Sequence, residues 1–264
     1  MNKIKTIIQK EWAEVFRNRL VVFTVTFLPL IMAAIPLGIL FAMRGETVMP
    51  DAATDFPEAI NAMCPPELSG SECFQVYMVS QFMLMFMILP LAIPATFAAY
   101  SIVGEKTTRS LEPLLATPIT TIELLVGKSL AAVIPAVLAT YAAFGVYALG
   151  AFILIPNRMI YAAMMDSRWL IAVIIVGPLM ALMAVMASVM VSSRVNDPRV
   201  AEQLSMVVIV PLLAVFFGQI AGLFIVDRRF VIVSAVALLL VDVVLVYFAV
   251  KLFQRETILT RWKS

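Results

Sequence analysis

The sequence predicts an all-α integral membrane protein with six transmembrane helices, an N-terminal amphipathic elbow helix and a short helix in a cytoplasmic loop. Of the 264 residues, 62% are hydrophobic and only 14% are charged, and the mean hydropathy is +1.01. A soluble chain of this length would expose far too much apolar surface at that composition. The apolar residues form long continuous runs, which suit helices crossing a hydrocarbon core of about 30 Å and lack the alternation of a membrane β-barrel.

Residues 1–19 predict the elbow helix. Ile4, Ile7, Ile8, Trp12 and Val15 recur at helical spacing among charged residues, which is typical of a helix lying along the membrane surface. A simple positively charged anchor would explain the cations nearly as well. The first apolar run follows this charged segment and continues for a full span, so no cleavable signal peptide is evident.

The predicted spans cover about residues 20–43, 75–103, 123–155, 169–191, 204–226 and 230–250. Prolines inside several of them predict bends, which neighbouring helices tolerate by pairing the freed backbone groups. Residues 44–74 form an acidic loop that belongs outside the cell. No linker, soluble domain or internal repeat is evident, so residues 1–264 are interpreted as one membrane domain.

Lysine and arginine residues predict the orientation. Fourteen of them fall on the face that carries both termini and five on the other face, which together account for all 19. Because cytoplasmic loops carry the excess of cations, both termini are expected in the cytoplasm. The predicted location is the cell (inner or cytoplasmic) membrane, with several passes through it.

The longest polar interruption on the cytoplasmic side is GEKTTRSLEPLLATPITTIELLVGK, over residues 104–128. Ser110 as an N-cap and Pro118 as a stop predict a short helix at about 110–117. Its apolar face carries three leucines at helical spacing, Leu111, Leu114 and Leu115. Thr120 and Glu123 then form a capping-box pattern that predicts the start of the third span.

This run resembles the cytoplasmic loop between the second and third spans of ATP-binding-cassette (ABC) export permeases of the ABC-2-type superfamily. In such permeases the loop carries a coupling helix that docks on a separate ATPase subunit. The resemblance is dense at Gly104, Glu105, Lys106, Ser110, Leu111, Glu112, Leu114, Leu115, Pro118, Glu123, Gly127 and Lys128. It implies that the ATPase contacts Glu105, Arg109, Leu111, Glu112, Leu114 and Leu115. The alternative for the leucines is a helix in the headgroup layer with no protein partner.

The resemblance implies the permease subunit of an ATP-driven exporter, which moves a hydrophobic or amphipathic substrate, or an ion, outward by alternating access. It implies two copies of an ATPase subunit, which hold the ATP and Mg, and a second permease half in the lipid bilayer, either a second copy of this chain in a homodimer or a similar partner chain. No nucleic-acid partner is implied. The alternative is the membrane part of a mechanotransmitting ABC complex that acts on a lipid or membrane protein without solute export.

The chain itself is expected to be non-catalytic and to bind no cofactor or metal. It contains no histidine. The tripeptide Gly127-Lys128-Ser129 resembles the end of a phosphate-binding loop, but Ile122 stands where the motif needs a glycine. Asp242 is the only acid deep in a span, so no facing pair of carboxylates is available.

The two cysteines, Cys64 and Cys73, both fall in the predicted external loop. A disulfide between them is expected where the compartment is oxidising. Free thiols or soft-metal ligands are the weaker alternative, because two sulfurs alone make a poor metal site.

The second and fifth spans are the candidates for lining the translocation route, because they carry polar or helix-breaking residues that a lipid-facing helix has no reason to keep. The candidate route-lining residues are Gln81, Pro90, Gly218, Gln219, Gly222 and Asp242. Ordinary packing within one subunit would explain the small residues equally well. For Asp242 the favoured interpretation is a protonated or hydrogen-bonded acid that joins the sixth span to a neighbour.

Overall fold

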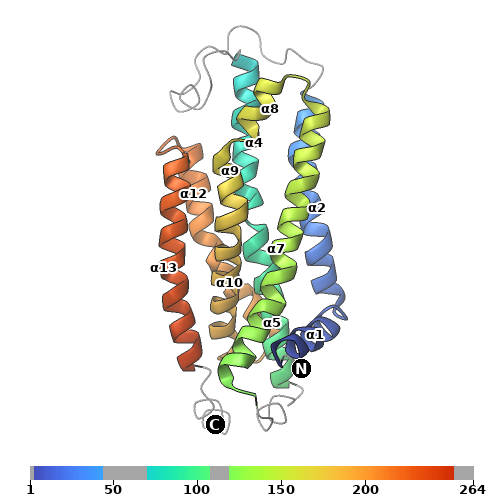
Figure 1. Cartoon of the computed structure of the whole chain (residues 1–264), viewed down its shortest axis with the longest axis vertical. Helices are drawn as coiled ribbons and strands as arrows, with labels where there is room; N and C mark the ends of the chain where they lie inside the picture. Colours follow the sequence, from blue (N-terminus) through green and yellow to red (C-terminus); the bar gives the residue numbers. More distant parts are fainter. Residues whose placement is uncertain (1–2, 44–69, 108–118, 253–264) are drawn as a thin grey trace.

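The computed structural model describes residues 3–43, 70–107 and 119–252, and within these ranges the chain forms helices and no strand. Among these described residues, six helical segments are long and apolar enough to cross a membrane: Val21–Ala42, Glu72–Gly104, Ile122–Leu154, Arg158–Ser192, Pro198–Ile220 and Arg228–Leu252. They run side by side along the long axis of the molecule (Figure 1). The predicted all-α class with six transmembrane helices is therefore confirmed.

Helix α1 (Lys3–Val15) lies across one end of this bundle, which we call the α1 end (Figure 1). Helix α2 (Arg19–Ala42) starts at the α1 end, and α13 (Arg228–Leu252) finishes there. The opposite end carries the start of α4 (Gly70–Phe86) and the short α8 (Arg158–Met164). The first and last described helices thus meet the same end, as an even number of spans requires.

The second span is broken into α4 and α5 (Leu89–Thr107) by a turn at residues 87–88. Pro90 lies just after the break; it has no N–H, and inside a continuous helix its ring would clash with the carbonyl one turn earlier. The chain resumes as α5 because proline fits the first turn of a new helix. The bend predicted in this span therefore lies at its first proline.

Helix α7 (Thr121–Leu154) begins with the predicted capping box. The Glu123 N–H donates to the Thr120 hydroxyl over 3.2 Å, and the Thr120 N–H donates to the Glu123 carboxylate over 2.8 Å. Two N–H groups that have no partner inside the helix are satisfied in this way. The start of the third span is therefore where the sequence predicted it.

The fourth span changes geometry along its length, from α9 (Ser167–Ile171) through the π-helical segment η1 (Ala172–Val176) to α10 (Gly177–Ser192). Pro178 lacks the N–H that would bond the Ile174 carbonyl in an α-helix. The hydroxyl of Tyr141, on α7, donates to that carbonyl over 3.0 Å instead. A side chain of a neighbouring helix thus pairs the backbone group that the proline frees.

The fifth span differs from the expected 204–226. It begins at Pro198 and consists of α11 (Pro198–Ser205), the 3₁₀ segment η2 (Met206–Ile209) and α12 (Val210–Ile220). Gly222 ends it, with a φ of +71° that favours glycine. The N–H of Leu223 bonds the Gly218 carbonyl over 3.0 Å and that of Gly222 bonds the Gln219 carbonyl over 3.1 Å, which is a Schellman motif.

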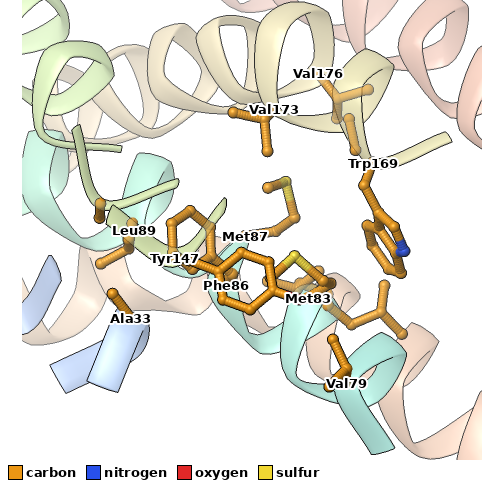
Figure 2. Packing of buried hydrophobic residues seen from close by; sticks show 14 of the residues in the cluster. Ala33, Val79, Met83, Phe86, Met87, Leu89, Tyr147, Trp169, Val173 and Val176 are labelled. Carbon is orange, nitrogen blue, oxygen red and sulfur yellow. The ribbon is translucent and has the colours of Figure 1, made fainter. Parts of the chain in front are cut away.

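The largest apolar core surrounds the second span. In Figure 2, Met83, Phe86 and Met87 from the second span meet Tyr147 of α7 and Trp169 of α9. In the most apolar stretch of the second span, 83% is buried inside the protein, whereas only 11% of the most apolar stretch of α13 is buried. The second span is therefore the centre of the subunit and α13 is its periphery.

Candidate functional site

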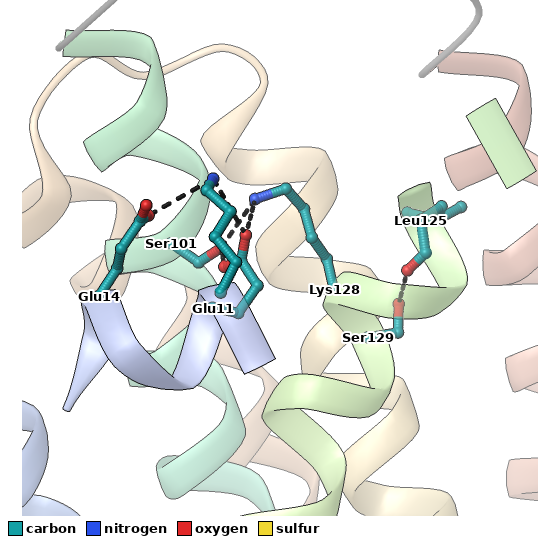
Figure 3. A network of polar contacts seen from close by, with 7 residues as sticks. Glu11, Glu14, Ser101, Leu125, Lys128 and Ser129 are labelled. Atoms are coloured by element: carbon teal, nitrogen blue, oxygen red, sulfur yellow. Dashed lines mark hydrogen bonds and ion pairs between the residues drawn. The ribbon is translucent and has the colours of Figure 1, made fainter. Parts of the chain in front are cut away.

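A buried polar network lies at the α1 end, between three helices (Figure 3). The Lys128 ammonium group of α7 lies 2.8 Å from Oε1 of Glu11 on α1 and donates to the Ser101 hydroxyl of α5 over 3.0 Å. The Ser101 hydroxyl donates to the other Glu11 oxygen, Oε2. All three side chains are buried, so one carboxylate joins three helices away from solvent.

The charges of this network compensate each other. A buried ammonium or carboxylate group without a partner would cost several kcal/mol, and each here has the other as its main partner. Lys10 adds a half-exposed cation 3.8 Å from Glu11 and bridges to Glu14 over 3.4 Å. Lys10 therefore links the buried network to the protein surface.

Two further contacts hold α1 against α7. The Trp12 indole N–H donates to the Ala131 carbonyl over 2.9 Å. Ile7 packs on Gly127, where a Cβ atom would lie only 2.8 Å from Cγ2 of Ile7. Gly127 thus allows α1 to approach α7 closely enough for Glu11 to reach Lys128. The apolar face predicted for the elbow helix packs on the bundle, while its position in the headgroup layer stays a prediction.

The network joins both helices that flank the predicted coupling loop. Ser101 lies near the end of α5, which runs to Thr107, and Lys128 lies two turns into α7. Five predicted ATPase contacts, Arg109, Leu111, Glu112, Leu114 and Leu115, lie outside the described residues. Glu105 falls in α5, but its side chain is also outside the described part. The contact of all six with an ATPase stays a prediction.

The predicted route-lining residues of the second and fifth spans lie mostly inside the subunit. Gln81, Pro90, Gly218 and Gln219 are buried, and both amide atoms of Gln81 and the amide oxygen of Gln219 have no hydrogen-bond partner in the structure as described. A Cβ at Gly218 would lie 2.7 Å from the ring of Phe224. Close packing and the Schellman turn at Gly222 therefore explain the two glycines, and a place along a route stays a prediction for all of these residues.

Asp242 is buried on α13, which packs against α10. Neither carboxylate oxygen has a hydrogen-bond partner among the described residues. The expected hydrogen bond from this acid to a neighbouring helix is therefore not present in the described part of the chain. A functional role for Asp242 stays a prediction.

Cys73 is buried near the start of α4 and is disulfide-bonded. Its expected partner, Cys64, lies outside the described residues. The bonded state of Cys73 agrees with the predicted pair, and the pairing itself stays a prediction that mass spectrometry of unreduced protein checks.

The Glu11 network was missed from the sequence, although a signal for it was present. Glu11 stands four residues from both Ile7 and Val15, so it lies on the apolar face of α1 and not among the solvated charges. Lys128 likewise follows an apolar stretch, but it was interpreted as part of the family resemblance and as the end of an incomplete phosphate-binding motif, not as a member of a buried pair. An acid and a base that each interrupt an apolar face are a reason to expect a buried pair.

No group of three or more metal-ligating side chains occurs among the described residues. No curated protein matches the chain. The family model described as "ABC-2 family transporter protein" matches residues 5–228, which include most of α1, all three members of the Glu11 network and the first residue of α13. With its six spans and this match over most of its length, the chain belongs to the ABC-2 family of transporter proteins, as a multi-pass membrane component of transport.

Proposed function

We propose that this chain is the permease subunit of an ATP-driven exporter that moves a hydrophobic or amphipathic substrate, or an ion, outward by alternating access. The observation that carries the proposal is the Glu11 network. It ties α1 to both helices that flank the loop resembling the ATPase-docking loop of ABC-2-type permeases. In this proposal the α1 end of the bundle faces the cytoplasm, and the protein lies in the cell membrane.

The network supports a specific mode of coupling. An ATPase that displaces the loop would move the end of α5 and the start of α7, since these are the residues that continue from it. Glu11 bonds to a side chain on each of these helices, so α1 would move with them. The three helices then act as one unit at the ATPase-facing end, which is the arrangement that a transmitted displacement requires.

The energy is proposed to come from a partner. The sequence carries only the last part of a phosphate-binding loop, and Lys128 of that part is engaged with Glu11. Two ATPase subunits would hold the ATP and Mg, and this chain would contribute no catalytic residue. The family to which it belongs is a membrane transport component that is generally non-catalytic.

A second copy of the chain is proposed to complete the transporter, related to the first by a two-fold axis along the membrane normal. One subunit alone would enclose only one side of a translocation route. The large apolar side chains Phe217 and Ile220 of α12 are exposed in the single subunit, which supports the fifth span as part of the contact. Lipid is the competing occupant of this face, and cross-linking distinguishes the two.

Purification of the permease with its ATPase tests the coupling proposal. Replacing Leu111→Asp and Leu114→Asp together should abolish co-purification of the ATPase, or leave ATP hydrolysis that no longer responds to the permease, because the apolar docking face is lost. The same change at Leu68→Asp, in the loop predicted on the opposite side of the membrane, is the matched control and should have no effect. Unchanged co-purification and unchanged hydrolysis in the double variant would refute the assignment.

A flux assay in sealed vesicles then separates export from work on a membrane component. ATP-dependent accumulation of a substrate in inverted vesicles would support export. Intact ATPase coupling without any flux, across a panel of amphipathic compounds and ions, would favour the mechanotransmitting alternative.

A further inference from the structure

A second hydroxyl group of helix α5 donates a hydrogen bond to a glutamate, as Ser101 does to Glu11. The Thr96 hydroxyl of α5 donates to Oε1 of Glu202, on α11, over 2.7 Å. The same hydroxyl lies 3.1 Å from the Ala92 carbonyl one turn earlier in its own helix. A hydrogen bond to a carboxylate is roughly twice as strong as one between neutral groups, so Glu202 is the dominant acceptor.

Close packing surrounds this bond. Ala201, next to Glu202, is completely buried against Ala99 and Val103 of α5. Small side chains let two helices approach closely, and here they bring the backbone of α11 near that of α5. The carboxylate of Glu202 is therefore held in place by packing on one side and by the Thr96 hydroxyl on the other.

The two glutamates bond to α5 on different sides and more than one helical turn apart. Thr96 and Ser101 are five residues apart, which places them about 7.5 Å apart along a helix and about 140° apart around it. Ser101 bonds to Glu11 of α1, and Thr96 bonds to Glu202 of α11. The middle part of α5 is thus bonded to the elbow helix on one side and to the fifth span on the other.

The fifth span is built so that a displacement of α11 would continue along it. Helix α11 passes through the 3₁₀ segment η2 into α12 without a loop. Asp197 caps its start by accepting from the Arg199 N–H over 2.8 Å, so the segment is a defined helix from its first turn. Its side chains Val200 and Leu204 are exposed, with relative accessibilities of 43% and 49%.

We propose that Glu202 is a positioning residue that transmits the movement of α5 to the fifth span, so that the loop, the elbow helix and the fifth span move together. This inference rests on the proposed function, because it needs an ATPase that displaces the loop. It adds a specific link: the Thr96 hydroxyl to Glu202 bond carries the displacement from the central helix to α11 and α12. The Glu11 network by itself joins α1, α5 and α7 and includes no bond to the fifth span.

The experiment uses the full permease with its ATPase, in lipid nanodiscs, and measures distances by pulsed electron paramagnetic resonance with and without ATP and vanadate. The first spin-label pair combines Leu204→Cys, which reports on the fifth span, with the reference Phe41→Cys, which lies at the end of α2 away from the α1 end. A second pair reports the loop flank, with Val126→Cys and the same reference. All three positions are exposed. Cys64 and Cys73 are replaced by serine, and labelled chains are diluted with unlabelled ones.

In the otherwise unchanged protein, ATP and vanadate should shift both distances. Thr96→Val removes the hydroxyl at nearly constant shape, so it should abolish the Leu204 shift and leave the Val126 shift. Thr96→Ser keeps the hydroxyl and should restore the Leu204 shift. The matched control is Thr140→Val, because the buried Thr140 hydroxyl bonds to Ala136 of its own helix; it should leave both shifts.

The outcomes separate this inference from the proposed function. A Leu204 shift that persists at full size in Thr96→Val would overturn the role of Glu202 while leaving the proposed function intact. If neither distance responds to nucleotide in the unchanged protein, the proposed function itself fails, and this inference with it. If Thr96→Val abolishes both shifts, the variant Glu202→Gln is measured next, because it keeps an acceptor for the Thr96 hydroxyl. Loss of both shifts in Glu202→Gln as well would show a general structural role for this contact and would overturn the inference.

Discussion

Trp12 donates a hydrogen bond to the α7 carbonyl group that Pro135 leaves without a backbone donor. In a regular helix the Ala131 carbonyl would accept from the N–H of residue 135, and proline has none. The indole N–H of Trp12 donates to that carbonyl over 2.9 Å. The elbow helix is therefore fixed to the third span by a backbone group that the span itself cannot satisfy.

Trp12→Phe should reveal this relationship. It keeps an aromatic ring but leaves the buried Ala131 carbonyl unpaired, which costs about 1–3 kcal/mol. The measurement is the free energy of unfolding in detergent. In a Pro135→Ala background, where the helix can supply its own N–H, the same change should cost clearly less. Equal costs in both backgrounds would contradict the pairing.

Gly127→Ala should destabilise the protein although alanine favours helices. The new methyl group would lie 2.8 Å from Cγ2 and 3.0 Å from Cβ of Ile7, which are close to the α1 backbone, so α1 must shift. Such overpacking costs about 1–3 kcal/mol. Gly145→Ala on the same helix is the control, since no heavy atom lies within 4 Å of its added Cβ. Thermal unfolding compares the two, and a second change, Ile7→Ala, should relieve the cost at Gly127.

The buried pair of Glu11 and Lys128 predicts a non-additive double variant. Lys128→Met or Glu11→Leu alone removes one member of the buried ion pair and leaves the other behind, and each should cost about 3–5 kcal/mol. The double variant removes both charges and should cost less than either single change. Chemical unfolding of all four proteins measures the coupling, and purely additive losses would show that the two charges do not depend on each other.

Asp242→Leu separates a structural from a functional role for this acid. Both carboxylate oxygens are buried without a partner among the described residues, so removing them should raise the free energy of unfolding by about 1–3 kcal/mol. Thermal unfolding and the flux assay are run on the same preparation. A more stable protein that has lost transport would assign Asp242 to the route, whereas a less stable one would show that a partner for the acid exists.

Cross-linking tests the proposed dimer contact. Phe217→Cys and Ile220→Cys place thiols on the exposed side of α12, whereas Gly218 is covered by Phe224 and is unsuitable. In a background lacking Cys64 and Cys73, these variants should form dimers on oxidation more readily than Phe23→Cys, which is equally exposed on α2. Preferential cross-linking at Phe23 would move the contact to the first span.

Much of the architecture follows from local sequence properties. The apolar runs determine the six helices, because no other structure satisfies the backbone in a membrane apart from a closed barrel. Thr120 and Glu123 determine the start of α7, because a capping box needs only residues three apart. The end of the fifth span was missed, although Gly222 is a local signal, because apolar residues continue beyond it to Val226.

By itself the sequence determined the class of protein, the number of its spans and its resemblance to ABC-2-type permeases, since each depends on composition or on a contiguous motif. Only the tertiary structure decided which polar residues meet. Glu11 and Lys128 are 117 positions apart, and Thr96 and Glu202 are 106 apart. Helical periodicity indicates which face a residue occupies, but not which helix packs on that face. That choice depends on how closely the helices approach, and it is made by contacts such as Ile7 on Gly127 and Ala201 on Ala99.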